Sequence, residues 1–299
     1  MITREKTTRS GRLLEVDYYM VDRAGRRIPK HIPKPKSKAE LAAQEEYEKK
    51  RRIKKAVRYV NANFDESDYF MALTYDSKHA PLRFKRAEMD VQNYIARVKR
   101  HRAKELKKVE RQLRKLPRND AALKELRNAL LRKRRELRKP LKWWLSFEKV
   151  TYQTGRNKGK PNFHAHLIIS GGLSPWQMEK IWGKGIKTSA ESFKPEMWGP
   201  ESAARYMAKD PEGRRTIRHS RNLRAPADHI RDGAFTRANL EKLCKERVDD
   251  RAYWERKFKG YRLLQTAPRY NQYNGQWYMS VVMWKTDGTA PPWDNTIFE

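Results

Sequence analysis

Residues 161–170 read PNFHAHLIIS, an apolar run with two histidines that decides how the rest of the fold is interpreted. Alternate side chains of a β-strand point to opposite faces of the sheet, so His164 and His166 share one face and the apolar residues between them share the other. The stretch therefore predicts a strand with one core face and one face that carries two imidazoles. Two structural histidines would give the same pattern.

The run LKWWLSFEKVTY at 141–152 precedes this strand, and the loop QTGRNKGK, with its two glycines, predicts a β-hairpin between them. If the apolar faces of the two strands coincide, the register brings Glu148 beside His164 and His166. Two imidazoles and a carboxylate suit Mg²⁺ or Mn²⁺ when a phosphate adds further oxygens. The same donors also accept Zn²⁺ or Co²⁺.

A candidate nucleophile follows in SAARYMAKD at 202–210, which has a helical pattern. Tyr206 and Lys209 are three residues apart, so a helix places them on the same face. The ammonium group would favour the phenolate or neutralise a phosphate in the transition state. An ordinary amphipathic helix with a half-buried tyrosine and a surface lysine has the same spacing.

The composition points to a polyanionic partner. Among 299 residues, 69 are Lys or Arg and 36 are Asp or Glu, which gives a net charge of +33. No apolar run reaches the roughly 18 to 20 residues of a membrane span, and MITREKTTRS at the start does not resemble a secretory signal. Nucleic acid is therefore the expected partner, with no membrane contact.

Cysteine usage narrows the class of protein further. The single Cys244 excludes an internal disulfide framework and a cysteine-rich zinc module. A cytoplasmic location is expected.

Residues 1–64 are basic, with several prolines and then a charged helix expected from about Lys38 to Val60. This arm either contacts phosphates or is a solvated extension. A strand is expected from Tyr69, and a helix from about Lys85.

Residues 99–139 contain 18 Lys or Arg and 5 Asp or Glu, a net charge of +13. Leucines and a valine recur at heptad spacing on both sides of PRND at 117–120, which predicts an antiparallel helical hairpin. The hairpin is either a solvated spacer or a DNA-gripping element.

Beyond the histidine strand, Ser174 and Pro175 mark the start of a helix, and an edge strand is expected before residue 198. The C-terminal region, 216–299, has a charged helix expected near 236–258 and two strands around a turn at Asn274-Gly275. This region is a candidate for DNA or partner binding.

Three motifs occur in one order: FMALTYD at 70–76, FHAHLII at 163–169 and ARYMAK at 204–209. Together they resemble the HUH endonuclease superfamily, and within it the single-tyrosine rolling-circle replication initiators of small single-stranded DNA phages and plasmids. The resemblance covers about 65–215. Ala165 departs from it, because the superfamily prefers a bulky hydrophobic residue there.

The resemblance implies an α+β fold: a ferredoxin-like antiparallel sheet, here with an inserted helical hairpin at 99–139 and a C-terminal α/β extension. It also implies that His164 and His166 are metal ligands and that Glu148 is the acidic ligand. Tyr206 would be the nucleophile and Lys209 its companion.

The first motif of the family, here Thr74 and Tyr75, is either structural or in contact with DNA. Arg205, Lys158 and Lys160 are further candidates for DNA contacts.

The function implied is nicking and rejoining of single-stranded origin DNA by metal-dependent transesterification through a 5′-phosphotyrosine. A host helicase and polymerase would be partners. The alternatives are a non-catalytic nucleic-acid-binding protein and a plasmid mobilisation relaxase, although relaxases usually carry the tyrosine ahead of the histidines.

Overall fold

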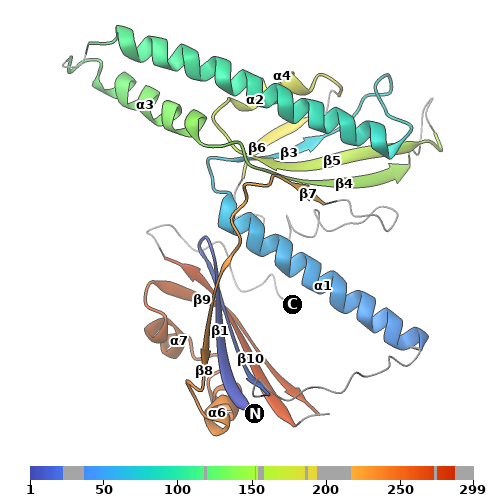
Figure 1. The fold of residues 1–299 in the computed structure, drawn as a ribbon, viewed down its shortest axis with the longest axis vertical. Helices are drawn as coiled ribbons and strands as arrows, with labels where there is room; N and C mark the ends of the chain where they lie inside the picture. The colour runs from blue at the N-terminus through green and yellow to red at the C-terminus, as the bar shows by residue number, and fades with distance from the viewer. Residues whose placement is uncertain are drawn as a thin grey trace. The chain divides into compact units, whose positions relative to one another are not determined.

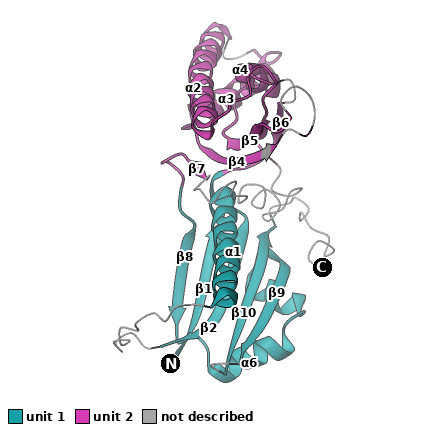
Figure 2. Ribbon diagram, turned by 90° about the vertical axis from the view of Figure 1, so that its right-hand side faces the viewer, with its two compact units in different colours: residues 1–63, 195–201, 224–299 teal, residues 64–194, 202–223 magenta. Residues whose placement is uncertain are grey.

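The structure is a computed structural model, shown in Figure 1, that describes residues 1–22, 37–117, 120–151, 153, 158–185, 188–193, 217–272 and 275–286. The chain forms two compact units, coloured separately in Figure 2. Among the described residues, unit 1 takes those in 1–63 and 224–286, and unit 2 takes those in 64–193 and 217–223.

Unit 2 is built on a five-stranded antiparallel sheet in the order β6-β3-β5-β4-β7. Its strands are β3 (Tyr69–Leu73), β4 (Trp143–Thr151), β5 (Pro161–Ile169), β6 (Ser189–Ser192) and β7 (Arg218–His219). The histidine strand β5 is therefore central, and the short strand β6 is an edge strand as expected.

The helices of unit 2 lie on one face of this sheet, as Figure 1 shows. They are α2 (Phe84–Lys115), α3 (Lys124–Arg138) and α4 (Pro175–Trp182). Helix α2 buries Val91, Tyr94, Ile95 and Val98 at three- and four-residue spacing against the apolar faces of the strands. Helix α4 begins at Ser174, whose side chain forms a capping box with Gln177.

The expected helical hairpin is present, but its first arm is not a separate insertion. Helix α2 runs without a break from the core into the basic region, and α3 returns beside it. Leu106, Leu113 and Leu130 lie between the helices and pack on the core of unit 2. The helix continues because no proline or glycine interrupts its apolar stripe.

The register of β4 and β5 places Glu148 opposite His164 and Ser146 opposite His166. Thr151 pairs with Pro161, so nine residues, 152–160, connect the strands. This odd connection makes the two apolar faces coincide, and it confirms the prediction that Glu148 lies beside the histidines.

Unit 1 is a second five-stranded antiparallel sheet, in the order β8-β1-β2-β10-β9. Its strands are β1 (Ile2–Ser10), β2 (Leu13–Val21), β8 (Ala227–Asp232), β9 (Tyr261–Asn271) and β10 (Gln276–Lys285). Strands β9 and β10 form the expected hairpin, although Asn274 lies outside the described residues.

Helices cover both faces of this sheet. On one face α6 (Arg237–Glu246) and α7 (Arg251–Lys257) pack over Leu14, Val16 and Tyr18 of β2. On the other face lies α1 (Lys38–Asn63), where Arg58 and Lys54 pair with the buried Glu15 carboxylate. The charged helix expected near 236–258 is thus two helices.

The structure divides the chain differently from the sequence-based division into 1–64, 65–215 and 216–299. The first residues are no extended arm, because β1 pairs with β8 and β2 pairs with β10. The N-terminal segment and the C-terminal region therefore share one sheet and one core. The partner strands are more than 200 residues apart, so local sequence patterns do not reveal the pairing.

The α+β fold class is confirmed by two antiparallel sheets and their helices. In the described ranges, no helix combines the length and the hydrophobicity that crossing a bilayer requires.

Candidate functional site

The two histidines lie on the face of the unit 2 sheet that points away from α2 and α4. Phe163, Ala165 and Leu167 of β5 are buried in the core beneath the helices, so the strand pleat directs His164 and His166 to the opposite side. Glu148 reaches the same face from β4. Backbone pairing thus brings the three predicted ligands to adjacent positions.

His166 and Glu148 are in direct contact. The Nε2 atom of His166 lies 3.3 Å from Oε2 of Glu148. The ring of His166 is 8% exposed and stacks on Phe70 of β3, with ring centroids 6.0 Å apart and planes inclined by 13°. Ring packing on one side and the carboxylate on the other therefore limit the orientations that this imidazole can take.

His164 lies in a setting that favours the neutral imidazole. Burial lowers its pKa, and the neighbouring His166 lowers it further, while the Glu148 carboxylate acts in the opposite direction. A neutral imidazole is the form that binds a metal ion.

Two of the three predicted metal ligands are in contact in the structure. Within the described ranges, no three His, Cys, Asp or Glu side chains are gathered as a group that could hold a metal ion as they stand. His166 and Glu148 meet, and His164 is directly opposite Glu148 in the register. The donor types suit a divalent ion, but in the described ranges His164 does not join His166 and Glu148 in one ligand group.

Two polar residues on this face were not singled out from the sequence. Asn162 and Ser146 have the same strand parity as the histidines and Glu148. Their side-chain oxygens are buried and have no hydrogen-bond partner among the described residues. Extending the two-residue period by one step in each strand would have identified both.

The first-motif residues contribute to packing. The carbonyl of Thr74 accepts a 2.6 Å hydrogen bond from Trp182 Nε1 of α4. The ring of Tyr75 is 7% exposed and makes an edge contact with Trp182. Burial and the nearby Asp90 raise the pKa of Tyr75. Of the two expected roles, the structure therefore favours the structural one for Tyr75.

The remaining predicted site residues lie at or beyond the limits of the described chain. Tyr206, Lys209 and Arg205 fall in 194–216, outside the described residues. Lys158 and Lys160 are exposed in the connection between β4 and β5.

A basic stripe runs along the outer face of α2. It consists of five exposed cations at spacings of four, three, four and three residues: Arg100, Lys104, Lys107, Arg111 and Arg114. The helical period places them on one line, and a rise of 1.5 Å per residue makes that line about 21 Å long. The buried Val98, Arg102 and Val109 lie on the opposite side of the helix.

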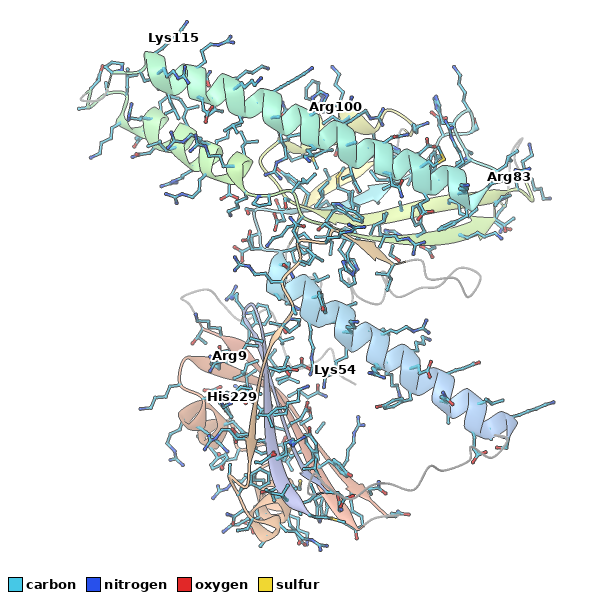
Figure 3. The ribbon with its side chains drawn as sticks, in the orientation of Figure 1. Arg9, Lys54, Arg83, Arg100, Lys115 and His229 are labelled. Atoms are coloured by element: carbon cyan, nitrogen blue, oxygen red, sulfur yellow. The ribbon has the colours of Figure 1, made fainter. Side chains whose placement is uncertain are left out.

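Two acids of α2, Glu105 and Glu110, pair with cations of α3 and so join the two helices. Glu105 Oε1 pairs with Lys133 Nζ at 2.6 Å, and Glu110 Oε1 pairs with Arg138 Nη2 at 2.6 Å. Figure 3 labels Arg83, Arg100 and Lys115 along α2, from the residue before its first turn to its last residue. A surface with only positive charge fits a phosphate backbone.

Comparison with known proteins gives no match to this chain among family models, curated proteins or solved structures.

Proposed function

We propose that the protein is a metal-dependent endonuclease of the HUH type that nicks and rejoins single-stranded origin DNA and so initiates rolling-circle replication. The observation that carries the proposal is the β4–β5 register, which sets Glu148 beside His164 and His166 on one sheet face. Those are the three residues that the resemblance to the superfamily assigns as ligands.

The topology of unit 2 supports the proposal. If the helix α3, which follows α2, is set aside, strands and helices follow in the order β3, α2, β4, β5, α4, β6, and the sheet order is β6-β3-β5-β4 with β7 added at one edge. A ferredoxin-like unit has this β-α-β-β-α-β order. The histidines are then on a central strand, where the superfamily carries them.

His164, His166 and Glu148 would hold Mg²⁺ or Mn²⁺, which when bound supplies Lewis-acid polarisation of the scissile phosphate. Asn162, on the same face, offers a buried amide oxygen next to that position. Tyr206 attacks phosphorus through its phenolic oxygen, and the bond from phosphorus to the 3′ oxygen breaks. The phenolic proton ends on the 3′ oxygen, which leaves a 5′-phosphotyrosine and a free 3′-hydroxyl.

Lys209 would stabilise the phenolate or the charge that develops on phosphate. Attack by a 3′-hydroxyl on the phosphotyrosine reverses the reaction and rejoins the strand without external energy. The free 3′-hydroxyl is a primer for a host polymerase, with a host helicase expected to unwind the template.

The basic surface supports DNA as the substrate. The stripe on α2 has no acid within it, and the chain carries a net charge of +33. Positive side chains hold phosphates without reading the bases, so binding should be strongly salt-dependent.

Covalent capture tests the proposal. Single-stranded oligonucleotides with a randomised centre and a label at the 3′ end are incubated with the full chain and Mn²⁺ and resolved on a denaturing gel. A labelled protein adduct is expected, because the strand attached through its 5′-phosphate keeps the label. EDTA and Tyr206→Phe should each abolish the adduct.

The control and the overturning results are distinct. Tyr47→Phe, at an exposed position on α1, should leave the adduct unchanged. An adduct that persists in Tyr206→Phe refutes the assignment of the nucleophile. An adduct that persists in both His164→Ala and His166→Ala refutes the metal site.

A non-catalytic nucleic-acid-binding protein is the second candidate. It is favoured by the lack of a ready three-residue ligand group in the described ranges. Salt-dependent binding to the same oligonucleotides, without an adduct from any sequence, would support this candidate against the endonuclease.

A further inference from the structure

Unit 1 contains a cavity that lies outside the candidate site on the unit 2 sheet. It has a volume of about 420 Å³ and lies between the β8-β1-β2 part of the sheet and helices α6 and α7. Its lining is Glu5, Tyr18, Arg231, Ala234, Phe235, Asn239, Lys242, Leu243, Arg247, Tyr253 and Lys257. The volume is within the range of small-molecule sites.

The mouth of this cavity is positively charged. The side chains of Arg231 and Lys242 are 59% and 61% exposed, so both ammonium and guanidinium groups reach solvent at the rim. Lys242 lies 3.8 Å from Glu246. Arg247 pairs with Asp250 at 2.5 Å, and its guanidinium carbon lies 5.3 Å from the ring centroid of Tyr253. The first turn of α6 also lines the cavity through Asn239, whose backbone amide is capped by the Thr236 hydroxyl, and the positive end of the helix dipole favours a negative group.

The floor of the cavity carries a negative charge, from the carboxylate of Glu5. Glu5 is 7% exposed, and its two oxygens lie 3.6 Å from Arg231 and 3.8 Å from Lys257, which are long distances for ion pairs. A buried carboxylate held so loosely retains capacity to accept hydrogen bonds.

A buried hydroxyl lies beside that carboxylate. Tyr18 is 1% exposed, and its hydroxyl has no hydrogen-bond partner of good geometry among the described residues. Burial raises its pKa, as do the charge of Glu5 and a hydrogen-bond interaction with that carboxylate, so the hydroxyl remains a donor beside Glu5. A buried polar group of this kind calls for a ligand or a water.

Aromatic rings complete the wall. Phe235 makes an edge contact with Tyr18 at a centroid distance of 5.4 Å, and Tyr253 lies across from them on α7. Lys257 lies 4.7 Å above the Tyr18 ring and partly offsets the charge of Glu5. Aromatic walls accept a flat, π-bearing ligand.

We propose that this cavity binds a nucleotide, with the base directed to Glu5 and Tyr18 and the phosphate held at the mouth by Arg231 and Lys242. A simple anion does not fit as well, because the floor would repel it. A base with an exocyclic amino group, as in adenine, cytosine or guanine, can donate to the Glu5 carboxylate, whereas thymine has no such group.

The nucleotide can come from a DNA strand or from the free pool, since both present the same base and phosphate. The inference does not depend on the proposed endonuclease function, because the lining residues all belong to unit 1 and the histidines belong to unit 2. The absence of any covalent adduct from the unchanged protein, or its persistence in Tyr206→Phe, would leave this inference untouched.

Calorimetry with the full chain tests the site, at about 0.3 M salt to screen non-specific contacts. The probes are dCMP, TMP, inorganic phosphate and a short single-stranded oligonucleotide. We expect dCMP to bind at least about tenfold more tightly than TMP or phosphate. Glu5→Gln should reduce that preference.

Arg231 and Lys242 are exposed at the rim, so replacing them should not disturb the fold. Arg231→Gln with Lys242→Gln should weaken dCMP binding at least about tenfold. The matched control is Lys245→Gln on the same helix, an exposed lysine that does not line the cavity. Thermal unfolding of each variant verifies that it is folded.

The arms of the experiment separate the outcomes. Binding of dCMP that the rim variant weakens and the control leaves unchanged identifies the free nucleotide as a ligand. The same pattern for the oligonucleotide alone identifies a strand nucleotide. Binding that is equal for phosphate and dCMP, or that the rim variant does not weaken, overturns the proposal.

Discussion

Asp68 is a buried acid whose titration bears on the stability of unit 2. It is buried at the start of β3 and accepts hydrogen bonds from the backbone amides of Asp65 and Gly171. Burial nevertheless raises its pKa to about 6. The folded protein therefore keeps a proton at a pH where the unfolded chain has lost it.

The sign of the effect follows from this proton. Between about pH 4 and pH 6 the folded state binds more protons than the unfolded state, so the free energy of unfolding falls as pH rises, by up to about 3 kcal/mol in total. Asp68→Asn should remove this slope. Urea titrations of both proteins across that pH range measure it, and parallel pH profiles would contradict the assignment.

The positions of His164, His166 and Glu148 could be predicted from strand parity, but their packing contacts could not. Strand parity alone predicted that His164 and His166 share a face, and the register confirms Glu148 as their neighbour. Parity did not predict that His166 would stack on Phe70, because that contact comes from β3, almost 100 residues earlier. Tyr75 is a similar case, since its burial depends on α4.

At the scale of elements, Arg102 connects the helical hairpin to the rest of unit 2. Its buried guanidinium donates to the carbonyls of Glu136 at 2.8 Å and Lys139 at 3.0 Å, and more distantly to Ser170 at 3.4 Å. The first two carbonyls lie at the C-terminal end of α3, where the Glu136 carbonyl also accepts the backbone N–H of Lys139 at 3.1 Å. One side chain therefore caps α3 and ties it to α2.

Arg102→Leu should lower the free energy of unfolding by about 2 to 4 kcal/mol, because buried carbonyls lose their donor. Thermal and urea unfolding measure the loss. Arg100→Leu, two residues away on the exposed stripe, is the control and should change stability by less than about 0.5 kcal/mol. Equal losses in the two variants would show that Arg102 has no special role.

The basic stripe on α2 has a prediction of its own. Changing Arg100, Lys104, Lys107, Arg111 and Arg114 to Gln should reduce the dependence of log K on log salt by up to about 3.5 for single-stranded DNA. The reason is that each lost phosphate contact removes the release of one counterion. Fluorescence anisotropy over a salt series measures the slope.

The control removes the same charge elsewhere. Five exposed cations of α1 are changed to Gln: Lys38, Lys49, Lys50, Arg51 and Lys55. A smaller change of slope is expected, because their sequence spacing does not form one line on the helix. Equal slopes for both variants would mean that net charge, and not the stripe, governs binding.

At the scale of the whole molecule, unit 1 depends on both ends of the described chain. Strands β1 and β2 find their partners in β8 and β10, and their apolar side chains pack under α6 and α7. A chain ending at residue 223 keeps β1 and β2 but lacks β8, β10, α6 and α7. An isolated two-stranded hairpin is marginal in water.

Truncation after residue 223 should therefore unfold β1 and β2 while unit 2 stays folded. Hydrogen exchange with mass spectrometry should show loss of protection in residues 2–21 and retained protection in β3, β4 and β5. Full protection of residues 2–21 in the truncated chain would contradict the shared sheet.

The sequence alone was sufficient for features that depend on neighbours along the chain. The two-residue period of β4 and β5, the Ser174-Pro175 start of α4, the heptad leucines of the hairpin and the excess of positive charge all arise within short windows. The period of a strand or helix decides which side chains share one side of that element, so these features can be predicted without knowing any distant contact.

Only the tertiary structure decided what depends on distant segments. β1 is mostly polar along its length and gains its place in a sheet through β8 and β2. The unit 1 cavity likewise brings Glu5 against Lys257 across 252 residues. Pairing between remote segments is set by the total burial and hydrogen bonding of the folded unit, and no local pattern in the sequence encodes it.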